Sequence, residues 1–132
     1  MRIADTSALY AAFVAEDAHH AKARDAMTDP EPILVCTEIL AETVALLQLR
    51  MGFEKARLAG AYLRGLRHVR IDGSSSGVAS AAWAEFERAN GKLSLPDAFV
   101  VAWCQAERAA ALAFDKEIIK RAGGPPLSLI HI

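Results

Sequence analysis

The first thirteen residues, MRIADTSALYAAF (1–13), place an acidic residue between an extended start and an apolar run. The pattern predicts a strand over 2–4 and a helix over 7–15, so Asp5 lies at the junction between them. Asp5, Thr6 and Ser7 are all common N-cap residues, because their side-chain oxygens accept hydrogen bonds from free backbone N–H groups. A helix cap would explain Asp5 if this junction were unique, but the chain repeats it.

Short apolar runs alternate with helical patterns along the whole sequence. The runs that predict strands are 2–4, 33–36, 68–71, 110–114 and 127–132. The patterns that predict helices are 7–15, 17–27, 38–50, 54–66, 76–90, 95–108 and 116–122. Turn residues separate these segments, as in DGSSSG (72–77). The alternation predicts an α/β fold of three layers, in which helices cover both faces of a parallel sheet of four to five strands.

Length and composition narrow the class of protein. A chain of 132 residues is the size of one domain, so we expect a single domain over 1–132. A hydrophobic content of 53% excludes a disordered chain, and no apolar run reaches the roughly 18 residues of a membrane helix. We therefore expect a cytoplasmic protein. Cys36 and Cys104 lie in apolar surroundings without a metal-ligand spacing, which favours small buried hydrophobes over a disulfide or metal site.

The charge distribution is uneven. The segment 50–70 carries six basic residues against one acid, a local charge of +5 in a chain whose net charge is −1. Such a segment is either a solvated helical face or a patch that contacts phosphates, and the sequence leaves both interpretations open. The basic residues are Arg50, Lys55, Arg57, Arg64, Arg67 and Arg70.

Four acidic residues stand out by their positions. Asp5 and Asp115 each follow a predicted strand, and Asp97 lies in the first turn of a predicted helix, three residues after Ser94. Helix capping could explain each of these three. Glu42 lies further inside a helix with apolar neighbours in sequence, where a carboxylate needs a partner such as a cation.

Together the four acids predict a metal site. Ligands bind open parallel sheets at the carboxyl ends of the strands, and that edge would gather these side chains. Carboxylates at such short range repel one another and require protonation or a counter-cation, for which Mg²⁺ or Mn²⁺ is suited. A bound metal ion of this kind supports phosphodiester hydrolysis. No Ser–His or Cys–His arrangement in the sequence indicates a covalent nucleophile.

The segments DTSAL (5–9), LAET (40–43), LSLPDA (93–98) and LAFDKE (112–117) resemble, in their order and spacing, the PIN domain of VapC-type toxin ribonucleases. The resemblance covers residues 1 to about 123. It implies that Asp5, Glu42, Asp97 and Asp115 bind one or two Mg²⁺ or Mn²⁺ ions and catalyse cleavage of RNA, commonly tRNA or a ribosomal RNA loop. It also implies a toxin–antitoxin pair with a VapB-type antitoxin, and a homodimer.

The sequence departs from the family pattern at a few positions. Ala113 stands where many relatives have Ser or Thr two residues before the fourth acid, and Asn90 and Lys92 stand where some carry an additional acid. His19 and His20 lie in a polar helix start, where we expect surface residues away from the strand ends.

Several functions remain open at this level. Arg57 and Arg64 are the residues of the basic segment that we expect to bind RNA. The alternatives to a toxin are a housekeeping RNA-processing nuclease and a non-catalytic PIN-like module that binds RNA or protein. An Asp-nucleophile phosphatase is disfavoured, because such enzymes usually carry a second acid two residues after the nucleophile, where this chain has Ser7.

Overall fold

The structure, a computed structural model, describes residues 1–123 of the chain. Its sheet has four parallel strands in the order β3-β2-β1-β4. The strands are β1 (Arg2–Ala4), β2 (Ile33–Cys36), β3 (Val69–Asp72) and β4 (Ala110–Leu112). The predicted parallel α/β sheet is confirmed, and the fifth strand predicted over 127–132 lies outside the described residues.

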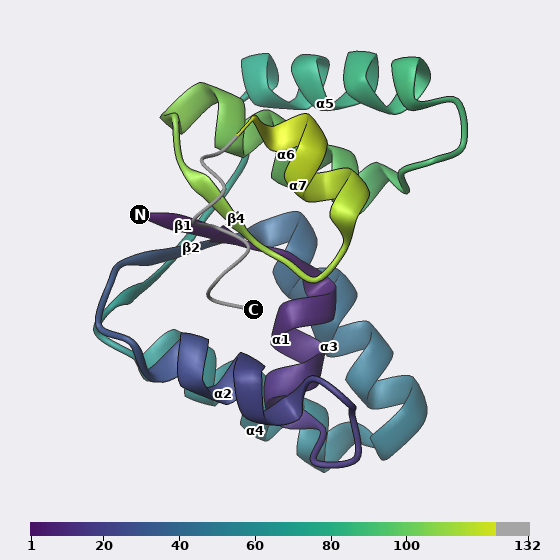
Figure 1. The fold of residues 1–132 in the computed structure, drawn as a ribbon. Helices are drawn as coiled ribbons and strands as arrows, with labels where there is room; N and C mark the ends of the chain where they lie inside the picture. The colour runs from purple at the N-terminus through teal and green to yellow at the C-terminus, as the bar shows by residue number, and fades with distance from the viewer. Residues whose placement is uncertain (124–132) are drawn as a thin grey trace.

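Helices cover both faces of this sheet (Figure 1). One layer contains α1 (Thr6–Phe13), α2 (His20–Thr28), α3 (Thr37–Met51) and α4 (Phe53–Gly65). The other contains α5 (Ser76–Ala89), α6 (Leu95–Glu107) and α7 (Lys116–Ala122). The predicted three-layer arrangement is confirmed, including the pairs of consecutive helices between strands.

Most boundaries agree with the prediction to within one or two residues, and two of the differences have local reasons. The helix predicted from residue 17 begins at His20, because tight turns fill the preceding segment: the Asp17 N–H donates to the Val14 carbonyl and the His20 N–H to the Asp17 carbonyl, both at 3.0 Å. The strand predicted over 110–114 ends at Leu112. The chain turns there because Asp115 caps the helix that follows.

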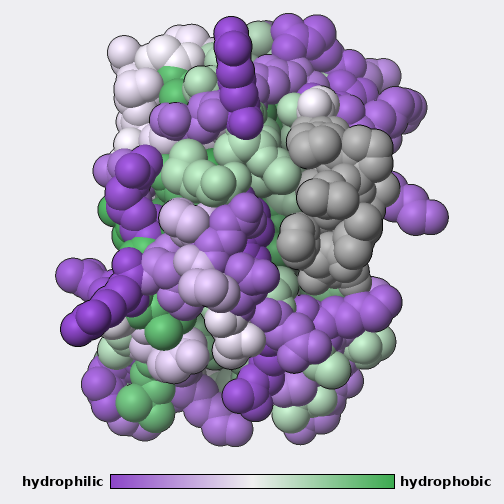
Figure 2. All heavy atoms as spheres, turned by 60° about the vertical axis from the view of Figure 1, so that its left-hand side comes forward, coloured by the Kyte–Doolittle hydropathy of each residue, from purple (hydrophilic) through white to green (hydrophobic). Residues whose placement is uncertain are grey.

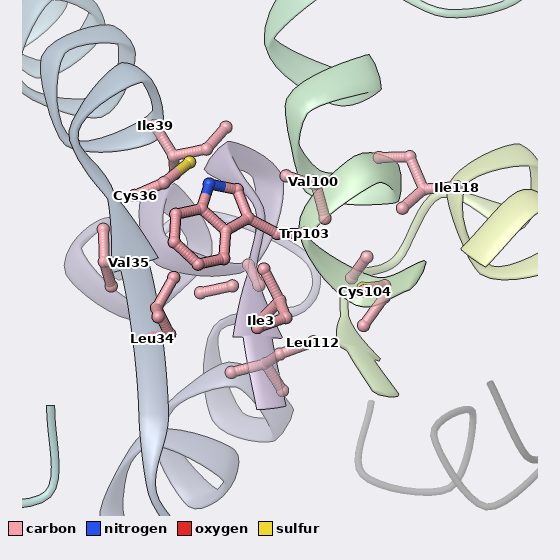
Figure 3. Packing of buried hydrophobic residues seen from close by; sticks show 14 of the residues in the cluster. Ile3, Leu34, Val35, Cys36, Ile39, Val100, Trp103, Cys104, Leu112 and Ile118 are labelled. Carbon is pink, nitrogen blue, oxygen red and sulfur yellow. The ribbon is translucent and has the colours of Figure 1, made fainter. Parts of the chain in front are cut away.

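The core lies on both sides of the strands. All four residues of β2 are buried, as expected for a parallel strand covered on both faces. Trp103 of α6 lies against the junction of β2 and α3, near Cys36 and Ile39 (Figure 3). Cys36 and Cys104 are free and buried, and burial raises the pKa of their thiols to about 11 and about 12. The prediction that both are small core residues is confirmed.

A buried arginine fixes the position of β1. The Arg2 side chain is 2% exposed, and its guanidinium donates hydrogen bonds to the carbonyls of Ala26 and Glu31, each at 2.6 Å. Its Nε also lies 2.9 Å from Glu31 Oε1. These contacts attach the first strand to the connection between α2 and β2.

A second buried ionic group connects α5 with α7. The Glu85 side chain is 7% exposed and forms ion pairs with Arg88 and with Arg121, whose Nη1 lies 3.1 Å from Glu85 Oε1. Burial opposes ionisation of Glu85, but the hydrogen bonds and charges of Arg88 and Arg121 outweigh it and hold the pKa of this carboxyl below its usual value. Arg121 also pairs with Glu117 on its own helix, so α7 is held to the layer by charge as well as by packing.

The face shown in Figure 2 is largely hydrophilic, with hydrophobic side chains in small groups between the polar ones. Among residues 1–123, no helix combines the length and the apolar character that crossing a membrane requires. Large hydrophobic side chains are nevertheless exposed on the helical layer that contains α4, where Leu58 and Tyr62 are 55% and 52% exposed.

Candidate active site

The carboxyl edge of the sheet brings two acids together. Asp5 directly follows β1, and Asp115 follows β4 after a short turn. The two strands are parallel neighbours with Ala4 opposite Leu112, and the Asp5 N–H donates to the Leu112 carbonyl at 3.1 Å. The backbone ladder therefore places both carboxylates at the same end of adjacent strands.

The other two acids reach the same place from helices. Glu42 lies in the second turn of α3, and Asp97 lies in the first turn of α6. All four carboxylates line one open pocket of about 470 Å³. The other residues that line it are Thr6, Ser7, Tyr10, Asp17, His19, Leu46, Arg50, Ser94 and Phe114.

Asp5 is the most buried of the four acids, with 1% of its surface exposed. Burial raises the pKa of its carboxyl to about 7. Hydrogen bonds from the Ala8 N–H and the Ser7 hydroxyl, at 2.9 and 2.8 Å, lower the pKa, whereas the charges of Asp97 and Asp115 raise it further. Asp5 is thus both the N-cap of α1 and a buried carboxyl that forms no ion pair with an arginine, lysine or histidine among residues 1–123.

Asp97 and Asp115 also combine a capping role with a place in the pocket. The Ser94 hydroxyl accepts from the Asp97 N–H at 3.2 Å, and the Asp97 carboxylate accepts from the Ser94 N–H at 3.3 Å, which completes the capping box expected from the sequence. Burial raises the pKa of Asp97, opposed by the Ser94 hydrogen bonds and reinforced by the charge of Asp115. Asp115 accepts from the Glu117 N–H at 2.8 Å at the start of α7.

Glu42 faces the pocket and is only partly buried. Its Oε1 accepts a hydrogen bond from the Thr6 hydroxyl. Glu42, Leu46 and Arg50 follow one another at intervals of four residues, so they form one stripe along the pocket side of α3. The expectation that apolar side chains surround Glu42 holds in sequence but not in space, because this face of the helix is open.

The chemistry of these donors fits a hard divalent cation. Every predicted ligand is a carboxylate oxygen, the kind of ligand that Mg²⁺ and Mn²⁺ prefer. Within the described part of the chain, no three His, Cys, Asp or Glu side chains converge tightly enough to form a finished metal site. Mg²⁺ keeps several waters and contacts few carboxylates directly, so a looser ring of acids around a pocket suits it.

The two arginines predicted to bind RNA lie elsewhere. Arg57 and Arg64 line a separate shallow pocket between α3 and α4 that also includes Val44 and Gly60. Both side chains are exposed, and Arg57 forms an ion pair with Glu54 on the same helix. The structure does not bring them to the acids, and their binding of RNA stays a prediction.

His19 lies closer to the site than the sequence suggested. It is exposed, as expected, but it lines the acidic pocket and its ring stacks on Phe114 with centroids 4.1 Å apart and an interplanar angle of 17°. The expectation that it lies away from the strand ends is wrong, because the turns before α2 return the chain toward β4. His20 does lie elsewhere, with its Nδ1 2.7 Å from the Ala11 carbonyl.

The pocket also contains residues that the sequence analysis did not assign to it. Tyr10, Asp17 and Arg50 line it beside the acids. The interval of eight residues from Glu42 to Arg50 was a usable signal, since residues four apart share a helix face. Tyr10 and Asp17 had no comparable signal, because their place depends on how α1 and the following turns pack.

A model of the PIN domain family matches residues 2–124 of the chain. The chain belongs to the PIN domain family. This PIN domain is similar to the crystal structure of Mycobacterium tuberculosis VapC20, a toxin that cleaves the sarcin–ricin loop. The TM-score is 0.82 at 28% sequence identity, over 95% of this chain and 97% of VapC20. No curated protein sequence matches the chain significantly.

Proposed function

We propose that this PIN domain is a metal-dependent endoribonuclease and acts as the toxin of a toxin–antitoxin pair. One observation carries the nuclease activity: Asp5, Glu42, Asp97 and Asp115 line a single pocket, where burial and the charges of Asp97 and Asp115 raise the pKa of Asp5. The similarity to VapC20, a toxin that cleaves the sarcin–ricin loop, supports the toxin role and a loop as the substrate. We propose loops of tRNA or ribosomal RNA.

Asp5, Glu42, Asp97 and Asp115 would hold Mg²⁺ or Mn²⁺ in the pocket. When bound, such an ion lowers the pKa of a coordinated water and neutralises charge on the reacting phosphate. The chain itself supplies orientation: Ser7 and the Ala8 N–H hold Asp5, Thr6 holds Glu42, and the capping box holds Asp97. The pocket is open to solvent on one side, which leaves room for an RNA strand.

Incubation of the purified protein with RNA tests this proposal directly. We expect cleavage of single-stranded or looped RNA with Mg²⁺ or Mn²⁺ and none in excess EDTA. Binding of RNA without cleavage in either metal would instead support the non-catalytic module. Hydrolysis of a chromogenic phosphate monoester without RNA cleavage would support the phosphatase.

Expression in a host without a partner protein separates a toxin from a housekeeping nuclease. We expect the wild type to arrest growth and Asp5→Asn to relieve the arrest, because the substitution removes the negative charge that holds the ion. Equal growth of both strains, with the wild-type protein detected in the cells, would exclude the toxin role and leave the housekeeping nuclease.

We further propose that the protein is one domain over 1–132, that it forms a homodimer and that its location is cytoplasmic.

We propose a VapB-type antitoxin as its partner. A large apolar pocket of about 880 Å³ between the α1–α2 and α3–α4 helix pairs supports a protein partner, with Phe13, Leu58 and Tyr62 in its lining. An arginine of the antitoxin in the acidic pocket would compete with the metal ion, since its guanidinium can pair with two carboxylates. Raising the Mg²⁺ concentration should therefore partly restore cleavage in the complex, and light scattering of the free toxin measures its assembly.

A further inference from the structure

Besides its four acids, the acidic pocket is lined by the stack of His19 on Phe114 and by Arg50, which has no carboxylate partner among residues 1–123; these three residues are called its wall. We propose that this wall binds one nucleotide of the RNA beside the cleavage site, with His19 stacking on its base and Arg50 contacting a phosphate. This inference rests on the proposed ribonuclease activity and names two substrate-binding residues for it.

His19 presents a supported aromatic ring to the pocket. Its imidazole is exposed, whereas Phe114, on which it stacks, is half-buried and packs against the core. The His19 N–H donates to Asp17 Oδ1 at 2.8 Å, which fixes the backbone at the start of α2. Phe114 directly precedes Asp115, so the stack lies next to an acid of the site. A ring held in this way offers a nucleobase a stacking surface, a contact available to every base.

Arg50 supplies the positive charge of the pocket. Its guanidinium lies 5.3 Å from the centre of the Tyr10 ring, and its Nη1 donates to the Tyr10 hydroxyl at 3.2 Å. Among residues 1–123 it has no carboxylate partner, in contrast to Arg57, which is paired with Glu54. The tyrosine thus orients the guanidinium and leaves its charge available to a phosphate.

The distance along α3 indicates which phosphate Arg50 contacts. Eight residues separate Glu42 from Arg50, which is about 12 Å along an α-helix. We therefore assign to Arg50 a phosphate next to the one that the acids hydrolyse. In this arrangement the acids carry the chemistry, and His19 and Arg50 set the register of the strand.

Abasic substitution tests the base contact. A short fluorescent single-stranded RNA that the enzyme cleaves is prepared with one abasic nucleotide at each position in turn, and its binding is measured in Ca²⁺ and its cleavage in Mg²⁺ or Mn²⁺. We expect one position at which loss of the base weakens binding to the wild type on the order of tenfold. His19→Ala should weaken binding of the intact RNA by a similar factor, and removing the base at that position should then cause no further loss of affinity. His19→Phe keeps an aromatic ring, so removing the base should weaken its binding as it does for the wild type.

Additive effects of His19→Ala and every abasic substitution would overturn the base contact. Loss of base dependence in His19→Phe as well would point to the imidazole nitrogens and would also overturn stacking. Circular dichroism melts of each variant show that it is folded.

The salt dependence of binding tests the phosphate contact. Arg50→Gln should lower affinity for the short RNA and reduce the slope of log affinity against log salt by about one, the change expected for one lost phosphate contact. Arg67→Gln is the matched control, because Arg67 is an exposed arginine that does not line the pocket, and its slope should equal that of the wild type. A slope for Arg50→Gln equal to that of the wild type would overturn the contact.

The same experiments distinguish failure of this inference from failure of the proposed function. If the wild type does not cleave RNA, the proposed function is wrong, whatever the binding data show. If the wild type cleaves RNA but the abasic effects are additive and the salt slopes are unchanged, the nuclease activity stands and the proposed nucleotide contacts are wrong.

Discussion

The Thr6 hydroxyl donates a hydrogen bond to the Glu42 carboxylate across 36 residues of sequence. Thr6 is buried at the start of α1, one residue after Asp5, and Glu42 lies on α3. The bond therefore connects the helix that Asp5 caps to the acid on α3. Groups that orient a metal ligand from behind in this way typically contribute strongly to metal affinity.

Thr6→Val should weaken metal binding without removing a carboxylate. The valine has nearly the same shape but no hydroxyl, so we expect the Mg²⁺ concentration for half-maximal cleavage to rise on the order of tenfold or more. Thr6→Ser should retain most of the affinity. Thr37→Val is a control at the start of α3, because Thr37 is exposed and does not line the pocket. The same metal dependence in Thr6→Val and the wild type would argue against this orienting role.

Asp5→Asn and Asp97→Asn should each abolish metal-dependent cleavage and leave the protein folded. The amide keeps an oxygen that accepts the capping hydrogen bonds at Ala8 and Ser94 but removes the negative charge that binds the ion. Cleavage assays with Mg²⁺ or Mn²⁺ and thermal melts of each variant check this. Full activity in either variant would show that its carboxylate is dispensable.

The stability of the metal-free protein should fall as pH rises toward neutrality. In the folded state the pKa of Asp5 is about 7, raised by burial from 3.8. Between these two values the folded protein holds a proton that the unfolded chain has released, so the free energy of unfolding decreases with pH. The decrease amounts to roughly 3–5 kcal/mol at 1.36 kcal/mol for each pKa unit.

Urea titrations at pH 5 and pH 8 in EDTA measure this effect against Asp5→Asn, which lacks the titrating group. Between pH 5 and pH 8 the wild type should lose more free energy of unfolding than Asp5→Asn does. Mg²⁺ should also raise the melting temperature of the wild type more at pH 8 than at pH 6, because the ion competes with the proton on Asp5. An Mg²⁺ effect independent of pH would mean that Asp5 does not bind the ion.

Glu85, which does not line the acidic pocket, should stabilise the fold, so Glu85→Gln should lower the free energy of unfolding. It leaves the guanidinium of Arg121 without its partner on α5, and an imperfectly paired charged group in this half-buried setting costs about 2 kcal/mol. Glu54→Gln is the matched control, because the Glu54–Arg57 pair is exposed on both sides and should add little to stability. Equal denaturation midpoints for the two variants would mean that the α5–α7 ion pairs are not stabilising.

Arg57 and Arg64 should increase affinity for long RNA without taking part in the chemistry. They lie outside the acidic pocket on an exposed helix, so replacing both with alanine should weaken binding and flatten its salt dependence while single-turnover cleavage at saturating RNA stays nearly intact. A short RNA that fills only the acidic pocket should bind the double variant as well as the wild type. Unchanged affinity for long RNA would mean that these arginines only form a solvated helical face.

The sequence predicted the elements and the gathering of acids because both depend on local patterns. Strand and helix periodicities are local, and Asp5 and Asp115 follow adjacent strands whose register brings them together. Side chains placed by tertiary packing were not predictable in this way. Arg2 is buried although arginine is usually exposed, because carbonyls 24 to 29 residues away meet its guanidinium. His19 reaches the pocket through turns that carry no periodic signal.

The strand order has a consequence for synthesis in the cell. β1 is made first but lies between β2 and β4, and β4 is made last of the four described strands. Asp5 receives its neighbour Asp115 only after the residues between β1 and β4 have been synthesised. A nascent or prematurely terminated chain therefore contains the first three acids without the fourth and without the strand that aligns it. The acidic pocket is therefore completed by the last of the four described strands to be synthesised.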